Sequence, residues 1–130
     1  MTYSIVNSRI YPMGDLNDMQ NRIVAFRDAR DWRQFHNPKD MAVSLVLEAS
    51  EFLEHFQWKS NDEVEDYLKS NINAVSEELA DTLYWILLIA NDLDINLAQA
   101  LSDKMKKNEK KYPVDKAKGK HTKYTELKSK

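Results

Sequence analysis

Apolar side chains recur at helical spacing through most of this 130-residue chain, and the pattern leaves little room for a sheet. Between residues 38 and 57, and again between 71 and 93, they return every three to four positions, the repeat of one face of an α-helix. Two glycines and three prolines are too few for the turns of a many-stranded β fold. Because 42% of the residues are hydrophobic, the chain can bury a core. The sequence predicts one all-α domain over residues 1–130.

Interruptions of the apolar pattern divide the chain into four main helices and one short helix, which predicts a four- to five-helix bundle. The expected helices cover approximately residues 15–36, 38–57, 61–68, 71–93 and 97–111. Asp15 is the expected N-cap of the first helix, and Asn61 or Asp62 that of the short one, because such side chains accept hydrogen bonds from free N–H groups. Residues 1–14 are expected to be irregular, and residues 114–130 to form a basic tail.

Charge and composition exclude several classes of function. The formal net charge of −2 gives no general attraction to a nucleic acid polymer or an anionic membrane, so neither is expected as a partner. Cysteine is absent, which removes disulfides, thiolate catalysis and zinc–thiolate sites. The longest apolar run, residues 83–90, is much shorter than the ~20 residues of a membrane-spanning helix. The N-terminal residues show no secretory signal pattern, so a cytoplasmic protein is expected.

The helix predicted over residues 38–57 carries acids beside its apolar face. On a helical wheel of ~100° per residue, Glu48 and Glu51 share a polar wedge between two apolar stripes. Glu48 lies only ~20° from Met41 on this wheel, so it borders the core, whereas Glu54 points elsewhere. Carboxylates that border a core are unfavourable unless something compensates their charge.

A second pair of acids stands on the helix predicted over residues 71–93. Glu78 and Asp81 share a face with Trp85, and after Asp81 the segment is hydrophobic all round, the pattern of a helix enclosed on every side. Neither pair of acids has a lysine or arginine three or four positions away on the same face. A hard divalent cation such as Mg²⁺, which prefers oxygen ligands, would compensate the four carboxylates. The alternative is that both pairs belong to ordinary solvated helix faces.

The two acid motifs, ExxE at residues 48–51 and ExxD at residues 78–81, lie in a chain that resembles the all-α nucleoside triphosphate pyrophosphohydrolases of the MazG-like superfamily. Five ordered segments are most similar to the dCTP pyrophosphatase branch of that superfamily. They are FRDARDWRQFHNPKD (26–40), EFLEHFQW (51–58), EELADTLYWIL (77–87), KMKKNEKKYP (104–113) and KYTEL (123–127). The likeness runs from about residue 20 to residue 127 and so covers nearly the whole predicted bundle.

The resemblance implies a helical bundle assembled as a homotetramer, dependence on Mg²⁺, and hydrolysis of a (deoxy)nucleoside triphosphate, dCTP-like, to the monophosphate and pyrophosphate. It implies four metal ligands: Glu48, Glu51, Glu78 and Asp81. It further implies that the base and sugar are surrounded by His36, Trp58 and Trp85, and that the phosphates are held by Lys104 and Asn108. Trp85 stands where this branch commonly has tyrosine, a difference that bears on base preference.

The chemistry of the residues is compatible with this activity. Nucleotidyl transfer needs charge neutralisation and an in-line water more than it needs a protein nucleophile. Glu51 is the first candidate to take the proton of that water, and Glu48 the second. Lys104 and Asn108 lie four residues apart on one helix face, which suits a polyphosphate, although a solvated basic face has the same pattern.

The aromatic and imidazole side chains have alternative interpretations when the residues are taken alone. Trp58 either stacks on a base or covers the edge of the core, and Trp32 is expected to pack. His36 is either structural or part of the binding site. His55, one turn after Glu51, either orients that acid or satisfies a hydrogen bond at the core edge.

Other functions compete with a pyrophosphohydrolase for a dCTP-like substrate. One is broad activity on modified or non-standard nucleotides, and another is a helical oligomerisation or partner-binding module without catalysis. Such a module has no need for two acid pairs against apolar faces. A di-iron carboxylate protein would require Glu-x-x-His motifs, and Glu48, Glu51 and Glu78 have no histidine three residues on.

Overall fold

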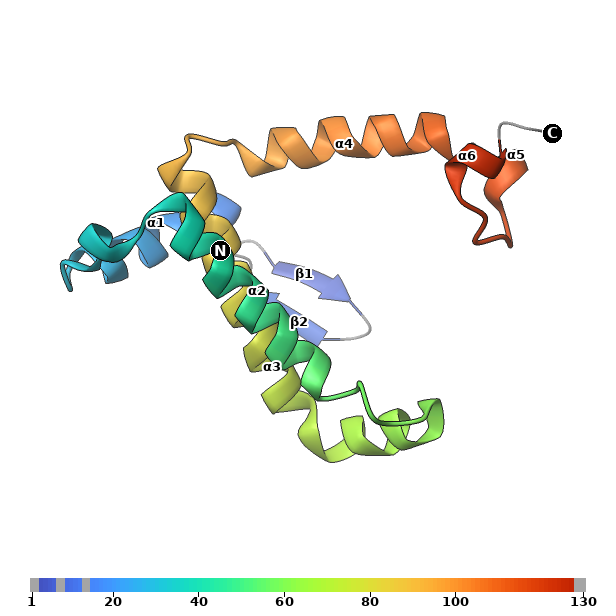
Figure 1. The fold of residues 1–130 in the computed structure, drawn as a ribbon, viewed down its shortest axis with the longest axis horizontal. Helices are drawn as coiled ribbons and strands as arrows, with labels where there is room; N and C mark the ends of the chain where they lie inside the picture. The colour runs from blue at the N-terminus through green and yellow to red at the C-terminus, as the bar shows by residue number, and fades with distance from the viewer. Residues whose placement is uncertain (1–2, 7–8, 13–14, 128–130) are drawn as a thin grey trace. The chain divides into compact units, whose positions relative to one another are not determined.

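The computed structural model describes residues 3–6, 9–12 and 15–127, and nearly all of them are helical (Figure 1). The helices are α1 (Leu16–Asp28), the 3-10 helix η1 (Trp32–Phe35), α2 (Pro38–Glu54), α3 (Asn61–Asp92), α4 (Leu97–Lys111), α5 (Val114–Ala117) and α6 (Tyr124–Leu127). Contacts divide the chain into two compact units, Met1–Asp94 and Ile95–Lys130. The predicted all-α class is confirmed.

The first two long helices begin at capped ends, the first at its predicted cap and the second at its predicted first residue, Pro38. The Asp15 carboxylate accepts a hydrogen bond from the backbone N–H of Asp18 (2.8 Å), so the predicted cap of α1 is present. At the start of α2, the Asn37 side chain accepts from the N–H of Asp40 (2.9 Å), and Pro38 occupies the first turn, where its missing N–H costs nothing. These caps place α2 directly after η1.

Helix α3 is a single helix of 32 residues, which corrects the prediction of a short helix followed by a separate long one. No glycine or proline interrupts residues 61–92, so the polar stretch around Ser70 does not break the hydrogen-bond ladder. Its N-cap is Ser60, not Asn61 or Asp62. The Ser60 hydroxyl accepts from the Glu63 N–H (3.4 Å), and the Glu63 carboxylate accepts from the Ser60 N–H (2.7 Å), a reciprocal capping box.

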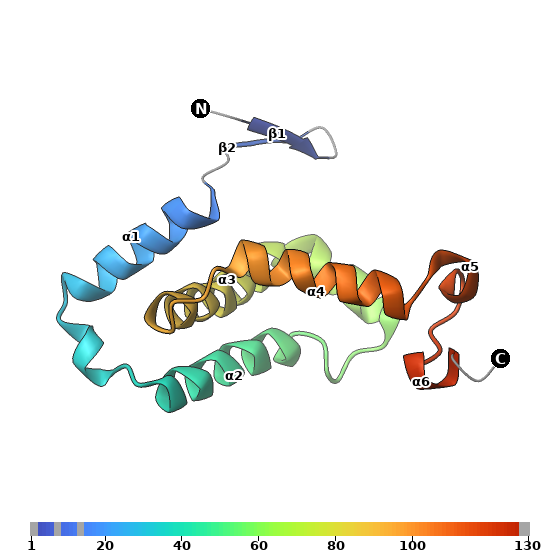
Figure 2. The same ribbon diagram turned by 90° about the horizontal axis from the view of Figure 1, so that it is seen from above.

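Within the first unit, α2 runs antiparallel beside α3, and α1 packs against α3 as well (Figure 2). The fully buried apolar residues gather where these helices meet: Met41, Val75, Leu87, Leu88 and Ala90. The Gln20 amide donates to the Leu87 carbonyl (2.9 Å) and ties α1 to α3. The sequence suggested that this helix is enclosed on every side. In the single chain it is not, because Leu79 and Leu83 remain 51% and 39% exposed.

The segment expected to be irregular contains a short hairpin. Strand β1 (Tyr3–Val6) pairs antiparallel with β2 (Arg9–Pro12), and Ile5 stands opposite Ile10. The two four-residue strands are rich in aromatic and β-branched residues, which favour extended backbone. Their alternation is too short to be distinguished from irregular chain by pattern alone. The hairpin is the only pair of strands among the described residues.

The second unit begins with α4, whose predicted bounds of 97 and 111 are matched. Its N-cap, Asn96, accepts from the N–H of Gln99 (3.0 Å). The segment expected as a tail folds into α5 and α6, and the Tyr124 ring lies 6.2 Å from that of Tyr112. None of the helices described is both long and apolar enough to cross a bilayer.

Candidate active site

The antiparallel pairing of α2 and α3 brings the two predicted acid motifs together. One carboxylate oxygen each of Glu48, Glu78 and Asp81 lies within 4.8 Å of the others, a spacing that would suit a shared cation. Glu51, three residues after Glu48 on α2, is a further acid near this group, and its charge contributes to the raised pKa of both Glu48 and Glu78. Negative charges gathered in one place disfavour one another, so the cluster calls for a compensating cation.

Burial and mutual repulsion raise the pKa of two of these acids. Partial burial is the largest cause of the raised pKa of Glu48, the charge of Glu51 comes next, and an indole N–H hydrogen bond from Trp85 acts in the opposite direction. Burial likewise raises the pKa of Glu78, followed by the charge of Glu51 and the hydrogen bond with it. Glu51 and Asp81 are exposed in the single chain, so the cluster is open to solvent on one side.

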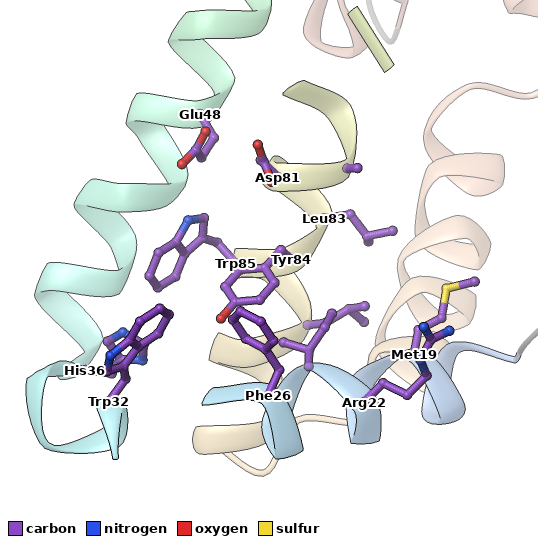
Figure 3. A pocket seen from close by; sticks show the side chains of 13 residues that line it. Met19, Arg22, Phe26, Trp32, His36, Glu48, Asp81, Leu83, Tyr84 and Trp85 are labelled. Carbon is purple, nitrogen blue, oxygen red and sulfur yellow. The ribbon is translucent and has the colours of Figure 1, made fainter. Parts of the chain in front are cut away.

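A cavity of about 830 Å³ adjoins the acids, and Glu48 and Asp81 lie together at one end of it (Figure 3). Five of the residues that line it carry aromatic rings: Phe26, Trp32, His36, Tyr84 and Trp85. Trp85 stands between the acids and His36, with its ring centroid 5.3 Å from that of the imidazole (Figure 3). A flat ring bound in this cavity would lie against aromatic faces while a group attached to it reached the carboxylates.

His36 contributes a polar atom without a partner to this region. Its Nδ1 is buried and has no hydrogen bond to any residue that the structure describes. Burial lowers the pKa of His36, and the positive charge of Arg27 lowers it further, against the opposing charge of Asp92. The imidazole is therefore neutral at pH 7 and can act as donor and acceptor at once.

Arg27 anchors α1 to the C-terminal end of α3 near this cavity. Its side chain is fully buried, its Nη1 donates to Asp92 (2.6 Å), and its Nε donates to Asp28 (2.9 Å). Burial is the largest single influence on the pKa of Asp92 and raises it, but the hydrogen bonds from Arg27 and Asn91, together with the charges of Arg27 and Arg33, give a net lowering. The sequence signal for this ion pair was an arginine four positions from Ile23, on a face that is otherwise apolar.

The structure brings together six of the residues singled out from the sequence: Glu48, Glu51, Glu78, Asp81, His36 and Trp85. Trp58 is elsewhere, 87% exposed after the end of α2 and outside the cavity wall. Lys104 and Asn108 lie on α4 in the second unit.

Sequence reasoning missed several side chains of the cavity. Trp32 was expected only to pack, yet it lines the cavity 5.8 Å from Phe26, and Tyr84 and Arg22 also contribute. The signal for Trp32 was available in the segment FRDARDWRQFHNPKD, which carries both Trp32 and His36. Phe26 and Tyr84 also lie in segments quoted for the resemblance (26–40 and 77–87), but their helical spacing does not distinguish a cavity wall from a core contact, and Arg22 lies outside those segments.

A comparison with protein families bears on what this site does. The model of the MazG-like family matches residues 43–127, which include both acid motifs, most of α2 and all of α3 and α4. The chain belongs to the MazG-like family. The family predicted from the acid motifs is thereby confirmed, and with it the fold class.

Individual relatives of this MazG-like chain extend the match. It is 36% identical to dCTP pyrophosphatase 1 of Mus musculus over 121 residues, 92% of this chain and 71% of that protein. It is 35% identical to dCTP pyrophosphatase 1 of Homo sapiens, with 89% and 69% covered. The crystal structure of a pyrophosphatase from Archaeoglobus fulgidus has a TM-score of 0.72 and 38% identity, and covers 81% of this chain and 99% of that one.

Proposed function

We propose that this chain is a Mg²⁺-dependent nucleoside triphosphate pyrophosphohydrolase that converts a (deoxy)nucleoside triphosphate, dCTP-like, to the monophosphate and pyrophosphate. One observation carries the proposal: the carboxylates of Glu48, Glu78 and Asp81, from α2 and α3, come together, and Glu48 and Asp81 line a cavity that also contains aromatic side chains. The names of the curated relatives support the reaction and the dCTP-like substrate, because those proteins are dCTP pyrophosphatases.

The donor set fits a hard divalent cation. Glu48, Glu51, Glu78 and Asp81 offer only carboxylate oxygens, the ligands that Mg²⁺ prefers, and burial followed by the charge of Glu51 raises the pKa of Glu48 and Glu78. When bound, Mg²⁺ would neutralise phosphate oxygens and lower the pKa of a water molecule. The chain itself would hold the metal through these four side chains.

The remaining roles fall to residues around the cluster. Glu51 is exposed and would accept the proton of the attacking water, with Glu48 as the second candidate. His36 and Trp85 would hold the base and sugar in the cavity, whose 830 Å³ lies within the usual range of small-molecule sites, about 300–1,000 Å³. A neutral imidazole with a free nitrogen suits the polar edge of a base.

The phosphates would be held by Lys104 and Asn108 of α4. The charge of the two units supports this part of the proposal. Residues 95–130 contain 11 lysines against 4 acids, a formal charge of +7, whereas residues 1–94 carry −9. Lysine side chains are suitable partners for the oxygens of a polyphosphate.

We also propose that the chain is a homo-oligomer, a tetramer by resemblance. The outward face of α2 leaves large apolar side chains in water, with Val46 63% and Leu47 57% exposed, and Leu79 of α3 adds to this surface. In such an assembly, the exposed Trp58 of one copy would contact a base bound by a neighbouring copy. Light scattering on the purified protein should give four times the chain mass of 15.2 kDa. A strictly monomeric protein would contradict the assembly.

The decisive experiment is an assay of a panel of dNTPs and modified nucleotides with Mg²⁺ and with EDTA. We expect pyrophosphate and the monophosphate as products, the highest kcat/KM for dCTP or a cytosine analogue, and no turnover in EDTA. Release of orthophosphate would overturn the reaction. Similar rates across the panel would favour the broad-specificity alternative, and complete inactivity would favour a partner-binding module. A cytoplasmic location stays a prediction of the sequence.

A further inference from the structure

Arg22 of α1 is the one lysine or arginine among the described residues that line the cavity. It lies beside Met19, on the side of the cavity away from Glu48 and Asp81 (Figure 3). Its guanidinium forms no hydrogen bond or ion pair with any residue that the structure describes, although Asp18 stands one turn earlier on the same helix. The function proposed above assigns no role to this cation.

A second arginine of the same helix shows what a structural role requires. Arg27 is fully buried and donates to the carboxylates of Asp28 and Asp92, so it holds α1 against α3. Arg22 is exposed and has no such partner among the described residues, so its charge does not hold the helix in place. Because it lines the cavity, its N–H donors are available to a bound molecule.

The charges around the cavity indicate the direction in which a nucleotide would lie in it. The triphosphate must reach a metal held by the acids, so the base extends toward the other side of the cavity. Phe26 follows Arg22 by four residues, on the same face of α1, and it also lines the cavity. A base that lies flat against Phe26 therefore presents one edge to the Arg22 guanidinium.

The chemistry of a guanidinium restricts which edge of a base can face it. Its N–H groups form a rigid fork that suits two adjacent acceptors, and it accepts no hydrogen bond. Cytosine offers N3 and O2 as adjacent acceptors, whereas N3 of uracil and thymine carries a hydrogen and would point a donor at the guanidinium. A pair of hydrogen bonds between arginine and a base contributes about tenfold or more to discrimination against the wrong base.

We propose that Arg22 determines base specificity by donating two N–H hydrogen bonds to N3 and O2 of cytosine. This inference rests on the proposed function in one respect, that the cavity holds the base of a nucleotide. It deepens that function, because it names the side chain that separates cytosine from uracil and thymine. Guanine also presents two adjacent acceptors, N7 and O6, so dGTP belongs in the test.

The first test compares kcat/KM for dCTP, dUTP, dTTP and dGTP in the wild type and in Arg22→Met, which keeps a long side chain without donors. We expect the wild type to prefer dCTP over dUTP by about tenfold or more, and Arg22→Met to reduce that ratio to about one, mainly through the KM for dCTP. Arg33→Met is the matched control, because Arg33 is exposed and does not line the cavity, and it should leave the ratio unchanged. An equal loss for all four nucleotides in Arg22→Met would overturn the proposal, and so would a preference of the wild type for dGTP.

Replacement of single groups of the base locates the contact. The nucleotide 3-deaza-dCTP, which has C–H in place of N3, should lose about tenfold in kcat/KM with the wild type and little with Arg22→Met. The deoxynucleoside triphosphate of 2-pyrimidinone lacks the amino group but keeps N3 and O2, so the wild type should still prefer it over dUTP. The reverse order of these two analogues would place recognition at the amino group and overturn the role of Arg22.

Binding without turnover separates this inference from the proposed function. Affinities for dCMP and dUMP in EDTA are measured through the fluorescence of Trp32 and Trp85, which line the cavity. We expect tighter binding of dCMP by the wild type and equal binding of both by Arg22→Met. The absence of any difference between dCMP and dUMP in the wild type would overturn this inference alone, even if nucleotides are turned over. Selective binding of dCMP without turnover of any triphosphate would overturn the proposed function alone.

Discussion

Two places along α3 hold acids against the apolar interior, and they differ in what neutralises them. At the C-terminal end, Asp92 faces the buried guanidinium of Arg27, and its pKa is lowered although burial alone would raise it. About four turns earlier on α3, burial and neighbouring acids raise the pKa of Glu78, and the same causes raise that of Glu48 on α2. No lysine or arginine contributes to either of these two raised values in the part of the chain that the structure describes.

The difference lies in the surroundings of the carboxyl groups and not in the groups themselves. Where the fold needs a charge beside its core, this chain supplies a partner from another helix, as Arg27 shows. At the acid cluster it supplies further acids and one imidazole, so the missing charge has to come from solution. That contrast is the physical argument for a cation site at Glu48, Glu78 and Asp81.

The largest expected effect is that of Glu51→Gln on the activity of the acid cluster, which has no paired lysine or arginine among the described residues. This substitution keeps the shape of the side chain but removes the charge and the proton acceptor, so we expect kcat to fall by about a thousandfold. Pyrophosphate release measures the rate, and circular dichroism should show unchanged helicity. The matched control is Glu54→Gln, an exposed glutamate at the end of the same helix. Equal activity of the two variants would remove Glu51 from the mechanism.

Arg27→Leu removes the Arg27–Asp92 ion pair and should lower the stability of the fold. It leaves Asp92, 10% exposed, without its partner, so we expect the free energy of unfolding in urea to fall by about 3 kcal/mol. Lys69→Ala is the control: it removes an exposed ion pair with Asp66 and should change stability by less than about 1 kcal/mol. Adding Asp92→Leu to Arg27→Leu should recover part of the loss. A similar small effect of both single variants would mean that the buried pair does not hold α1 in place.

The pH dependence of stability should sharpen the comparison with a smaller effect. Glu48 and Glu78 have pKa values above the ordinary 4.5, so the folded state binds their protons more tightly than the unfolded chain. Without metal, their contribution to the free energy of unfolding falls as pH rises from 4.5 through the raised values. Asp92 behaves oppositely: its contribution is present above 3.8 and is lost as pH falls through its lowered pKa.

Mg²⁺ should reverse the loss of stability that Glu48 and Glu78 cause as pH rises, because it binds the deprotonated acids of the folded state. Urea midpoints measured across this pH range, with and without saturating Mg²⁺, test the reversal. In the Arg27→Leu variant, Mg²⁺ should still stabilise the fold at the higher pH values. The loss of stability that Asp92 causes at low pH should be absent. Identical pH profiles with and without Mg²⁺ would contradict a metal site at these acids.

The sequence was sufficient where local chemistry decides the structure. The bounds of α4, the start of α2 and the cap at Asp15 follow from periodicity and capping side chains. The pairing of ExxE with ExxD followed from charge and spacing, since carboxylates at a core edge need a cation. The continuity of α3 was missed because a few polar residues in a helix resemble a loop when no neighbouring helix is known.

The sequence pattern does not predict which residues of different helices contact one another. The cavity wall combines Phe26 of α1, Trp32 of η1 and Tyr84 of α3, and nothing local to any one of them indicates the other two. The Arg27–Asp92 pair joins residues 65 positions apart, a distance over which helical periodicity carries no information. Trp58 illustrates the opposite case, because its predicted role requires a base or a neighbouring copy that one chain does not contain.

The acid cluster also has a consequence for how this protein would respond to selection in the laboratory. The four carboxylates repel one another in the metal-free fold, so they are a point of local frustration. A library screened only for survival of heating in EDTA would enrich amides and aliphatic side chains at positions 48, 51, 78 and 81. A library screened for turnover would restore the acids. The same four positions thus set the limit to which this helical pair can be made more stable without losing its chemistry.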